Sequence, residues 1–467
     1  MLFNSIAFLI FFPVVTIVFF LLRHKYRWLW LLAASCFFYM FFKPEYILIL
    51  AFTIIIDYYA GILLEKTTTA AKRKTYLILS LIANIGVLAI FKYFNFINSN
   101  ITGLATLLDL KNPIPYLNIL LPIGLSFHTF QAMSYTIEVY RGNQKAEKHF
   151  GIYALYVMFY PQLVAGPIER PQNILYQFHT RKYFSYENAL TGLRLIAWGL
   201  FKKIVIADRL AIYVNQVYGD VGNAGFLSVF FAVSFFTIQI YADFSGYSGI
   251  ARGTAKVMGY DLLINFKAPL KSKSITEFWQ RWHISLSTWF RDYLYIPLGG
   301  NRTKYHVRNL FIVFIISGLW HGANWTFIIW GLLHAIAVIY ETYTKKVRQR
   351  ISGSLPIIVS NIFSVVIVWL YLSFSWIFFR SETIHQAFLV IKKLFSFDLS
   401  VNYVQLFAGR GPLNFVVTIT SLILFYVMSL LLKNKSKKFD LLYILLLVFT
   451  IIILGKNGQS EFIYFQF

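Results

Sequence analysis

The chain has 467 residues, of which 58% are hydrophobic, 19% aromatic and only 13% charged. This composition excludes an ordinary soluble domain and predicts a membrane protein. The formal net charge of +24 would suit a nucleic-acid-binding protein. However, the Lys and Arg residues cluster between apolar stretches, as they do in cytoplasmic loops, so we expect no nucleic-acid partner.

Apolar stretches long enough to cross a lipid bilayer recur along the chain, with no long polar segment between them. The first has neither a basic n-region nor a small-residue cleavage site, which predicts a retained span rather than a signal peptide. Cys36 is the only cysteine, so an internal disulfide and a thiolate cluster are excluded and we expect no metal. The sequence therefore predicts one all-α polytopic membrane domain, with apolar stretches at 2–22, 28–42, 46–64, 76–94, 116–138, 190–213, 225–250, 357–379, 414–432 and 440–454.

The basic segments predict the orientation of the chain in the membrane. Lys and Arg cluster at 23–27, 72–74, 252–308, 345–350 and 433–438. If these segments are cytoplasmic, both termini are extracytoplasmic. The loop 380–413 fits this rule poorly, because it would lie outside and yet carries several basic residues.

Two segments break the simple alternation of spans, namely 151–165 and 310–340, and both are candidates for re-entrant structure. A straight helix over the second would be about 46 Å long, whereas the hydrocarbon core is about 30 Å thick. Gly318 and Gly322 bracket His321 in this segment, so we expect a broken or folded-back helix there. Because an imidazole in hydrocarbon needs polar surroundings, His321 is a candidate functional residue, although a hydrogen-bonded core histidine would be equally compatible.

The segment 276–302, TEFWQRWHISLSTWFRDYLYIPLGGNR, carries a second candidate, His283. Its aromatic and apolar residues recur at helical spacing, which predicts one amphipathic helix that lies at the cytoplasmic interface or dips into the bilayer. Two isolated carboxylates, Asp57 and Asp243, fall inside apolar runs and would suit the proton relay of a transporter. The sequence contains no phosphate-binding loop, no H-E-x-x-H motif and no nucleophile elbow. The residues alone thus leave an enzyme and a transporter open.

Several segments resemble the membrane-bound O-acyltransferase family, in its bacterial branch that acts in alginate O-acetylation and is related to the D-alanyl transfer membrane proteins. They are EFWQRWHISLSTWFRDYLYIPLGGNR and LWHGANWTFIIWGLLHA, preceded by LPIGLSFHTFQAMSYTIEVYRG, YPQLVAGPIERPQNI, FKKIVIADRLA and QIYADFSGYSGIARG, and followed by the terminal FIYFQF. The resemblance implies about 10–12 transmembrane helices, with re-entrant and interfacial helices, around a central tunnel. It also implies peripheral spans over about 1–115, a catalytic core over about 116–345, and C-terminal spans with an aromatic tail over about 356–467.

By this resemblance, His321 and His283 are the catalytic pair of an O-acetyltransferase in the bacterial inner membrane. The donor would be cytoplasmic acetyl-CoA, with no permanently bound cofactor. The final acceptor would be an extracytoplasmic polysaccharide such as an alginate-like polymer, reached through an SGNH-type acetyltransferase partner. Teichoic acid D-alanylation and peptidoglycan O-acetylation stay open as alternatives, and a transporter or flippase is the alternative from another class.

A basic run could bind the phosphates of coenzyme A, although the positive charge of cytoplasmic loops would produce the same pattern. It consists of Arg281, Arg291, Arg302, Lys304 and Arg308. In the aromatic tail, Tyr464 carries the only hydroxyl and has two interpretations. It either belongs to an aromatic anchor at the outer interface or relays the acyl group to the partner.

Overall fold

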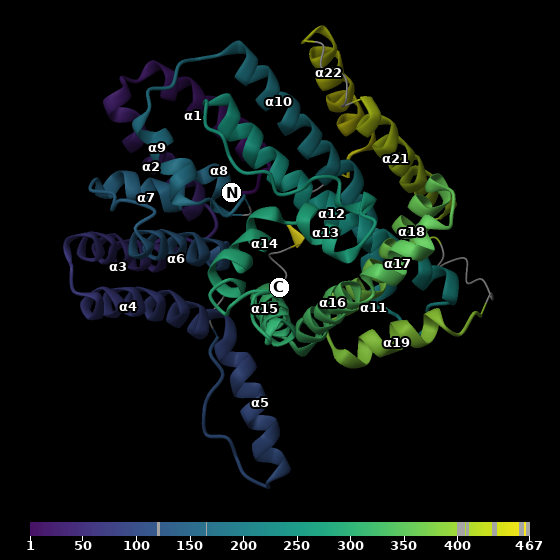
Figure 1. Cartoon of the computed structure of the whole chain (residues 1–467). Helices are drawn as coiled ribbons and strands as arrows, with labels where there is room; N and C mark the ends of the chain where they lie inside the picture. The colour runs from purple at the N-terminus through teal and green to yellow at the C-terminus, as the bar shows by residue number, and fades with distance from the viewer. Residues whose placement is uncertain are drawn as a thin grey trace. The chain divides into compact units, whose positions relative to one another are not determined.

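The computed structural model describes residues 1–467 except for 119–121, 165, 399–406, 408–410, 432–436, 457–461 and 464–467. Throughout this described part the regular structure is helical and includes no strand (Figure 1). The chain divides into two compact units. Unit 1 comprises 1–196 and 248–263, and unit 2 comprises 197–247 and 264–467. Two of the three boundaries fall inside the helices α10 and α12, and the third lies in the segment between α12 and η3. The all-α fold class is confirmed.

Unit 1 is built mainly from the N-terminal helices. Its elements are α1 (Ile6–Leu21), α2 (His24–Met40), α3 (Tyr46–Lys66), α4 (Ala70–Leu88), η1 (Ala89–Tyr93), α5 (Phe94–Leu107), α6 (Leu125–Arg141), α7 (Phe150–Met158), α8 (Tyr160–Leu163), α9 (Pro171–His179) and most of α10 (Tyr186–Leu200). The helix α6 begins at Leu125, although the apolar stretch begins at 116, and its N-cap Gly124 has a φ of 76°.

The helices α3, α4 and α6 pack side by side (Figure 1) and enclose one of the two isolated carboxylates. Asp57 of α3 accepts hydrogen bonds from Ser80 Oγ at 2.5 Å and from Asn84 Nδ2 at 2.9 Å, both on α4. A buried carboxylate needs such donors to offset its lost hydration. Asp57 therefore has a sufficient structural role within this bundle.

The segment 151–165 is short and broken. Helix α7 ends at Met158, and α8 starts at Tyr160 after a non-helical Phe159. Tyr156 and Tyr160 are fully buried, and the Tyr160 backbone N–H donates to Ser35 Oγ at 3.0 Å. Irregular backbone of this kind survives at membrane depth only where protein surrounds it, as a re-entrant segment requires.

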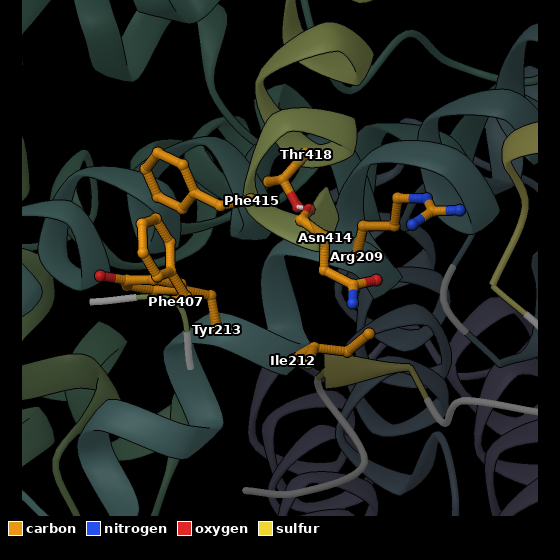
Figure 2. Close-up of a pocket in the computed structure, with 7 residues that line it drawn as sticks. All are labelled: Arg209, Ile212, Tyr213, Phe407, Asn414, Phe415 and Thr418. Atoms are coloured by element: carbon orange, nitrogen blue, oxygen red, sulfur yellow. Dashed lines mark hydrogen bonds between the residues drawn. The ribbon is translucent and has the colours of Figure 1, made fainter. Parts of the chain in front are cut away.

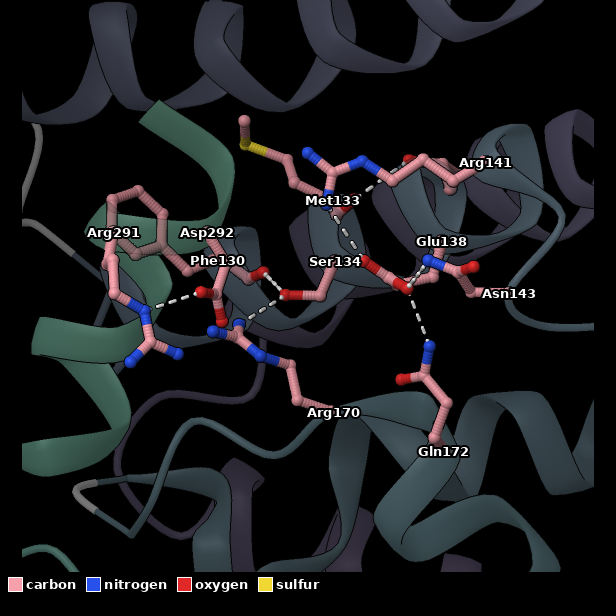
Figure 3. Close-up of polar contacts among 11 residues, drawn as sticks. Phe130, Met133, Ser134, Glu138, Arg141, Asn143, Arg170, Gln172, Arg291 and Asp292 are labelled. Carbon is pink, nitrogen blue, oxygen red and sulfur yellow. Dashed lines mark hydrogen bonds and ion pairs between the residues drawn. The ribbon is translucent and has the colours of Figure 1, made fainter. Parts of the chain in front are cut away.

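Polar side chains fasten the segments that follow α6. The Glu138 carboxylate accepts from Arg141 at 3.2 Å, Asn143 at 3.0 Å and Gln172 at 2.7 Å (Figure 3). These bonds tie the end of α6 to α9. Glu169, fully buried just before α9, accepts from the Leu263 backbone N–H at 2.6 Å. Burial raises the pKa of Glu169 to about 7.

Unit 2 holds the remaining elements. They are η2 (Phe201–Ala207), α11 (Asp208–Gly219), most of α12 (Phe226–Val257), η3 (Pro269–Lys271), α13 (Ile275–Arg281), α14 (Ile284–Phe290), η4 (Arg291–Tyr295), α15 (His306–His321), α16 (Trp325–Tyr343), α17 (Lys345–Gly353), α18 (Ile357–Arg380), α19 (Ile384–Leu394), α21 (Pro412–Leu431) and α22 (Lys437–Leu454).

The break expected in 310–340 is confirmed. Helix α15 ends at His321, Gly322 is extended, and α16 starts at Trp325. The two helices fold back against each other at very short range. A Cβ on Gly318 would lie 2.2 Å from the Phe327 carbonyl oxygen, and one on Gly331 would lie 2.3 Å from that of Phe314. Glycine is thus required at both positions, because any side chain would collide with the opposite backbone.

The single helix expected over 276–302 is wrong. The chain forms α13 and α14 with a sharp turn between them, because His283 has a left-handed backbone, with φ of 40°. Four of the five residues of the expected face, Phe278, Trp282, Leu286 and Trp289, are nevertheless buried, and the fifth, Tyr293, is half-buried. Apolar spacing predicted which residues are buried, but it cannot reveal one left-handed residue between two short helices.

Six helices of the described part of the chain are long and apolar enough to cross a membrane, which confirms a multi-pass membrane protein. They are Tyr46–Lys66, Ala70–Leu107, Phe226–Val257, Trp325–Tyr343, Ile357–Arg380 and Pro412–Leu431, and Ile6–Leu21 and Phe439–Leu454 are shorter apolar helices. The helices α2, α6, α10 and α15 have 15 to 17 residues, fewer than the roughly 20 of an upright span.

Candidate active site

His321 occupies the last position of α15, at the break before α16. Its side chain is 3% exposed and is enclosed by aromatic rings from three helices. The ring centroids of Trp330 on α16 and Phe379 on α18 lie 5.0 Å and 5.2 Å from that of His321, with both rings near perpendicular to the imidazole. The fold thus holds the imidazole at a helix C-terminus, where the negative end of the helix dipole favours positive charge.

His283 lies at the turn between α13 and α14 and is fully buried. Its left-handed backbone is held by Asn265, which sequence reasoning missed. The Asn265 carbonyl oxygen accepts from the Ile284 N–H at 3.0 Å, and its Oδ1 accepts from the Ser285 N–H at 3.2 Å. Asn265 thereby satisfies two of the N–H groups that the first turn of α14 leaves without helical partners. No local pattern could have identified it, because it lies 18 residues earlier in a loop.

Helix α13 is anchored at its N-terminus. Glu341, near the end of α16, accepts from the Ile275 N–H at 2.6 Å and from the Thr276 N–H at 2.8 Å. Ser274 caps the helix, accepting from the Glu277 N–H at 3.0 Å. A carboxylate at a helix N-terminus binds the unpaired N–H groups and the positive end of the dipole. Because Glu341 belongs to α16, that helix also helps to fix the position of His283, which lies beyond the other end of α13.

The structure brings the two candidate histidines to the same indole. The ring centroid of Trp320 lies 6.0 Å from that of His283 and 5.0 Å from that of His321. Burial lowers the pKa of His283 to about 3, so its imidazole is neutral near pH 7. The site thus combines a neutral His283 with His321 at a helix C-terminus, in an aromatic enclosure.

A third histidine, His334, belongs to the supporting structure. Trp279 Nε1–H donates to His334 Nδ1 at 3.3 Å, so the ring proton resides on Nε2, which lies 3.2 Å from Ser375 Oγ. This chain links α13, α16 and α18. His334 therefore fixes the aromatic wall of the site.

A cavity of about 520 Å³, which is within the usual size range of small-ligand sites, is lined by residues of the helices next to the two histidines, although neither histidine lines it. Ile284 follows His283 directly, and Ser317 precedes His321 by one helical turn, so the cavity reaches the elements that carry both. The lining is mostly apolar, with a few polar groups. It consists of Thr276, Trp279, Gln280, Ile284, Leu286, Ser287, Thr288, Phe290, Arg291, Tyr295, Leu310, Val313, Phe314, Ser317 and Val338.

The five basic residues of the expected donor site do not gather at one point. Arg291 is the one that lines the cavity; it is 59% exposed and pairs with Asp292 at 2.8 Å (Figure 3). Arg281 pairs with Glu277 at 2.5 Å. Arg302 and Lys304 are exposed in the segment before α15, and Arg308 is exposed in the first turn of that helix. The Lys304 and Arg308 cations lie over the Tyr305 ring.

A second cavity, drawn in Figure 2, has a volume of about 30 Å³ and holds no more than about one water molecule. It is lined by Arg209, Ile212 and Tyr213 of α11, by Phe407, and by Asn414, Phe415 and Thr418 of α21. Its size excludes a substrate role. Among the described residues there is no group of His, Cys, Asp and Glu side chains arranged to bind a metal ion.

The aromatic tail is described at two residues, whereas Tyr464 lies outside the described residues. Phe462 is 0% exposed and Ile463 is 4% exposed, and both belong to unit 2. These two side chains pack inside the protein, which disagrees with an anchor whose rings face the lipid headgroups.

The chain was compared with known proteins. The model of the membrane-bound O-acyltransferase family matches residues 147–380. The peptidoglycan O-acetyltransferase of Helicobacter pylori is 33% identical, with 94% of this chain and 91% of that protein covered. The probable alginate O-acetylase AlgI of Pseudomonas aeruginosa is 38% identical, with 85% and 75% covered. The teichoic acid D-alanyltransferase of Bacillus subtilis is 27% identical, with 58% and 71% covered.

The matched region contains both histidines and all the helices that enclose them. The relatives more than 30% identical are O-acetylases and extend over most of this chain. The chain therefore belongs to the membrane-bound O-acyltransferase family and is an acyltransferase.

Proposed function

We propose that this acyltransferase takes an acetyl group from acetyl-CoA on the cytoplasmic side of the bacterial inner membrane for O-acetylation of an extracytoplasmic polysaccharide. The observation that carries the proposal is the convergence of His321 and His283 on Trp320 beside an apolar cavity. The acetylase relatives, at 33% and 38% identity over most of the chain, favour acetyl over D-alanyl transfer, whose relative covers 58% of the chain at 27% identity.

In the proposed reaction, His321 acts as the general base. Its neutral imidazole takes the proton of the acceptor hydroxyl while the oxygen attacks the thioester carbonyl carbon. When the tetrahedral intermediate collapses, the carbon–sulfur bond breaks and the imidazolium returns its proton to the thiolate, which leaves as coenzyme A thiol. The C-terminal position in α15 stabilises that transient positive charge.

His283 supplies the complementary function. Because burial keeps its imidazole neutral, it carries one ring N–H that can donate to the oxyanion without competing for the transferred proton. A neutral donor in a site enclosed by aromatic rings requires no solvent reorganisation during the reaction. The two histidines thus divide the chemistry between a base and an electrophilic donor.

The cavity of about 520 Å³ is the proposed binding site for the pantetheine arm of the donor. That arm is narrow and has amide groups at intervals, which suits an apolar wall with hydroxyl and amide side chains such as Ser287, Thr288 and Gln280. Arg291, exposed at the cavity, is the basic residue best placed to meet a phosphate. The nucleotide part of coenzyme A would stay outside this cavity.

The final acceptor is proposed to be reached through Tyr464 and an SGNH-type partner. A hydrated polymer would lose far more solvation than an acetyl group on entering the protein. An acetyl ester of Tyr464 would be a good donor, because a phenol with a pKa of about 10 leaves more readily than an alcohol. An alginate-like polymer and peptidoglycan are the two candidate acceptors, since relatives named for each are comparably similar.

The decisive experiment is acyl transfer by the purified protein in liposomes with labelled acetyl-CoA. His321→Ala should abolish bond formation and leave the thermal unfolding midpoint nearly unchanged, because the ring serves the reaction. His385→Ala, which removes an exposed histidine of α19, is the matched control and should retain wild-type transfer. Movement of substrate without bond formation would instead indicate a transporter, and loss of folding in His321→Ala would indicate a core histidine.

A further inference from the structure

The second isolated carboxylate, Asp243 of α12, belongs to a buried ionic cluster. Lys203 Nζ of η2 lies 2.7 Å from Asp243 Oδ1 and 2.9 Å from Asp208 Oδ1 of α11. All three side chains are at most 5% exposed. Two carboxylates thus share this one ammonium group, and the remaining negative charge is stable in the interior only if further donors reach it.

One such donor comes from the C-terminal tail. The backbone N–H of Ile463 donates to Asp243 Oδ2 at 2.7 Å, across 220 positions of the sequence. A charge-assisted bond in a buried place is stronger than a neutral one at the surface. Asp243 therefore has a defined partner at the end of the chain, and its contacts are those of an attachment point.

Phe462, the residue before Ile463, is connected to the candidate active site through contacts between aromatic rings. The Phe462 ring centroid lies 4.4 Å from Tyr247 and 5.6 Å from Phe244, both on α12. Phe244 in turn meets the His283 imidazole at 4.6 Å, with the ring planes 87° apart. Phe462, Phe244 and His283 thus form a continuous row of aromatic contacts.

We propose that Phe462 and Ile463 form a docking segment that holds the C-terminal tail on α12 and fixes the wall behind His283. In this role Asp243 and Phe462 are positioning residues, acting on His283 through Phe244. The effect on catalysis rests on the proposed transfer reaction, whereas the docking itself does not.

A pair of substitutions at one position isolates the hydrogen bond. Ile463→Pro removes the N–H and keeps an apolar side chain, whereas Ile463→Ala keeps the N–H and shortens the side chain. We expect Ile463→Pro to lower kcat by about tenfold or more at an unchanged KM for acetyl-CoA, and by at least fivefold more than Ile463→Ala. Phe462→Leu should recover part of the activity lost in Phe462→Ala. Equal kcat values in the two Ile463 variants would overturn the proposal.

A second measurement tests docking without any transfer reaction. In a Cys36→Ser background, a cysteine introduced as Ile463→Cys should react slowly with a maleimide, because the side chain is buried. Adding Asp243→Ala should raise the labelling rate at least tenfold under native conditions, while an added Asp57→Ala in unit 1 should not. Equal rates with and without Asp243 would contradict docking, even if acetyl-CoA proved to be the wrong donor.

Discussion

At the residue scale, the two histidines differ in what surrounds them rather than in chemistry. His321 ends helix α15 and is buried among the rings of Trp320, Trp330 and Phe379. His283 is enclosed between Phe244 and Trp320, with a left-handed backbone held by Asn265, and burial keeps it neutral. In the proposed reaction, the same kind of side chain therefore serves as base in one place and as donor in the other.

This difference predicts how the His283 variants behave. His283→Ala should lower kcat by about 10² to 10³, the usual cost of losing one oxyanion donor. His283→Asn keeps an N–H donor and should recover part of that loss. Because the pKa of His283 is about 3, its charge does not change between pH 5 and 9, so the acid limb of kcat against pH should keep its position in His283→Asn. A shifted or missing acid limb would make His283 the base instead.

At the element scale, the active site depends on breaks in helices. The α15–α16 hairpin ends one helix at His321, and the turn between α13 and α14 places His283. Asn265 and Glu341 support the α13–α14 segment by accepting hydrogen bonds from its backbone N–H groups. The glycines of the hairpin let the two backbones approach to a distance that excludes any side chain.

Gly318→Ala is the sharpest test of that hairpin. Its Cβ would lie 2.2 Å from a backbone oxygen of α16, so the helices must separate. We expect a loss of about 1–3 kcal/mol in stability and a loss of transfer activity. Gly86→Ala, in α4 with open space around it, should be neutral or gain up to about 1 kcal/mol. Thermal unfolding of both variants provides the comparison, and equal midpoints would show that the hairpin can relax without cost.

At the scale of the whole molecule, the proposed reaction connects a soluble donor with a polymer on the other side of a membrane. The described part of the chain supplies apolar helices for the membrane, a cavity of about 520 Å³, and the buried side chains of Phe462 and Ile463 in unit 2. In our proposal the protein passes on an acetyl group and leaves the polymer to a partner.

Tyr464→Phe tests that division of labour. The substitution keeps the aromatic ring and deletes the hydroxyl, so an acyl relay through the phenol would stop while tail docking through Phe462 and Ile463 continued. We expect polymer acetylation, measured with the membrane protein and its partner together, to fall to background. Acetylation at the wild-type rate would show that the acetyl group bypasses Tyr464, and efficient acetylation without any partner would show that none is needed.

The sequence by itself determined the membrane class, the all-α architecture and the break near His321, and its resemblance to a family singled out His321 and His283 as candidates. Apolar length, glycine position and motif order are local properties, and these features follow from them. It did not reveal the turn at His283, because a left-handed residue leaves no trace in apolar spacing.

Only the tertiary structure decided which distant groups support the site. Three hydrogen bonds join residues that are distant in the chain: Ser285 to Asn265, Ile275 to Glu341, and Ile463 to Asp243. It also changed the interpretation of Asp57 and Asp243, which the sequence left as a possible proton relay. Each is bound by its own neighbours, Ser80 and Asn84 in one case and Lys203 and Ile463 in the other. A single sequence contains no signal for such contacts, since buried polar groups are satisfied by whichever segments the fold brings to them.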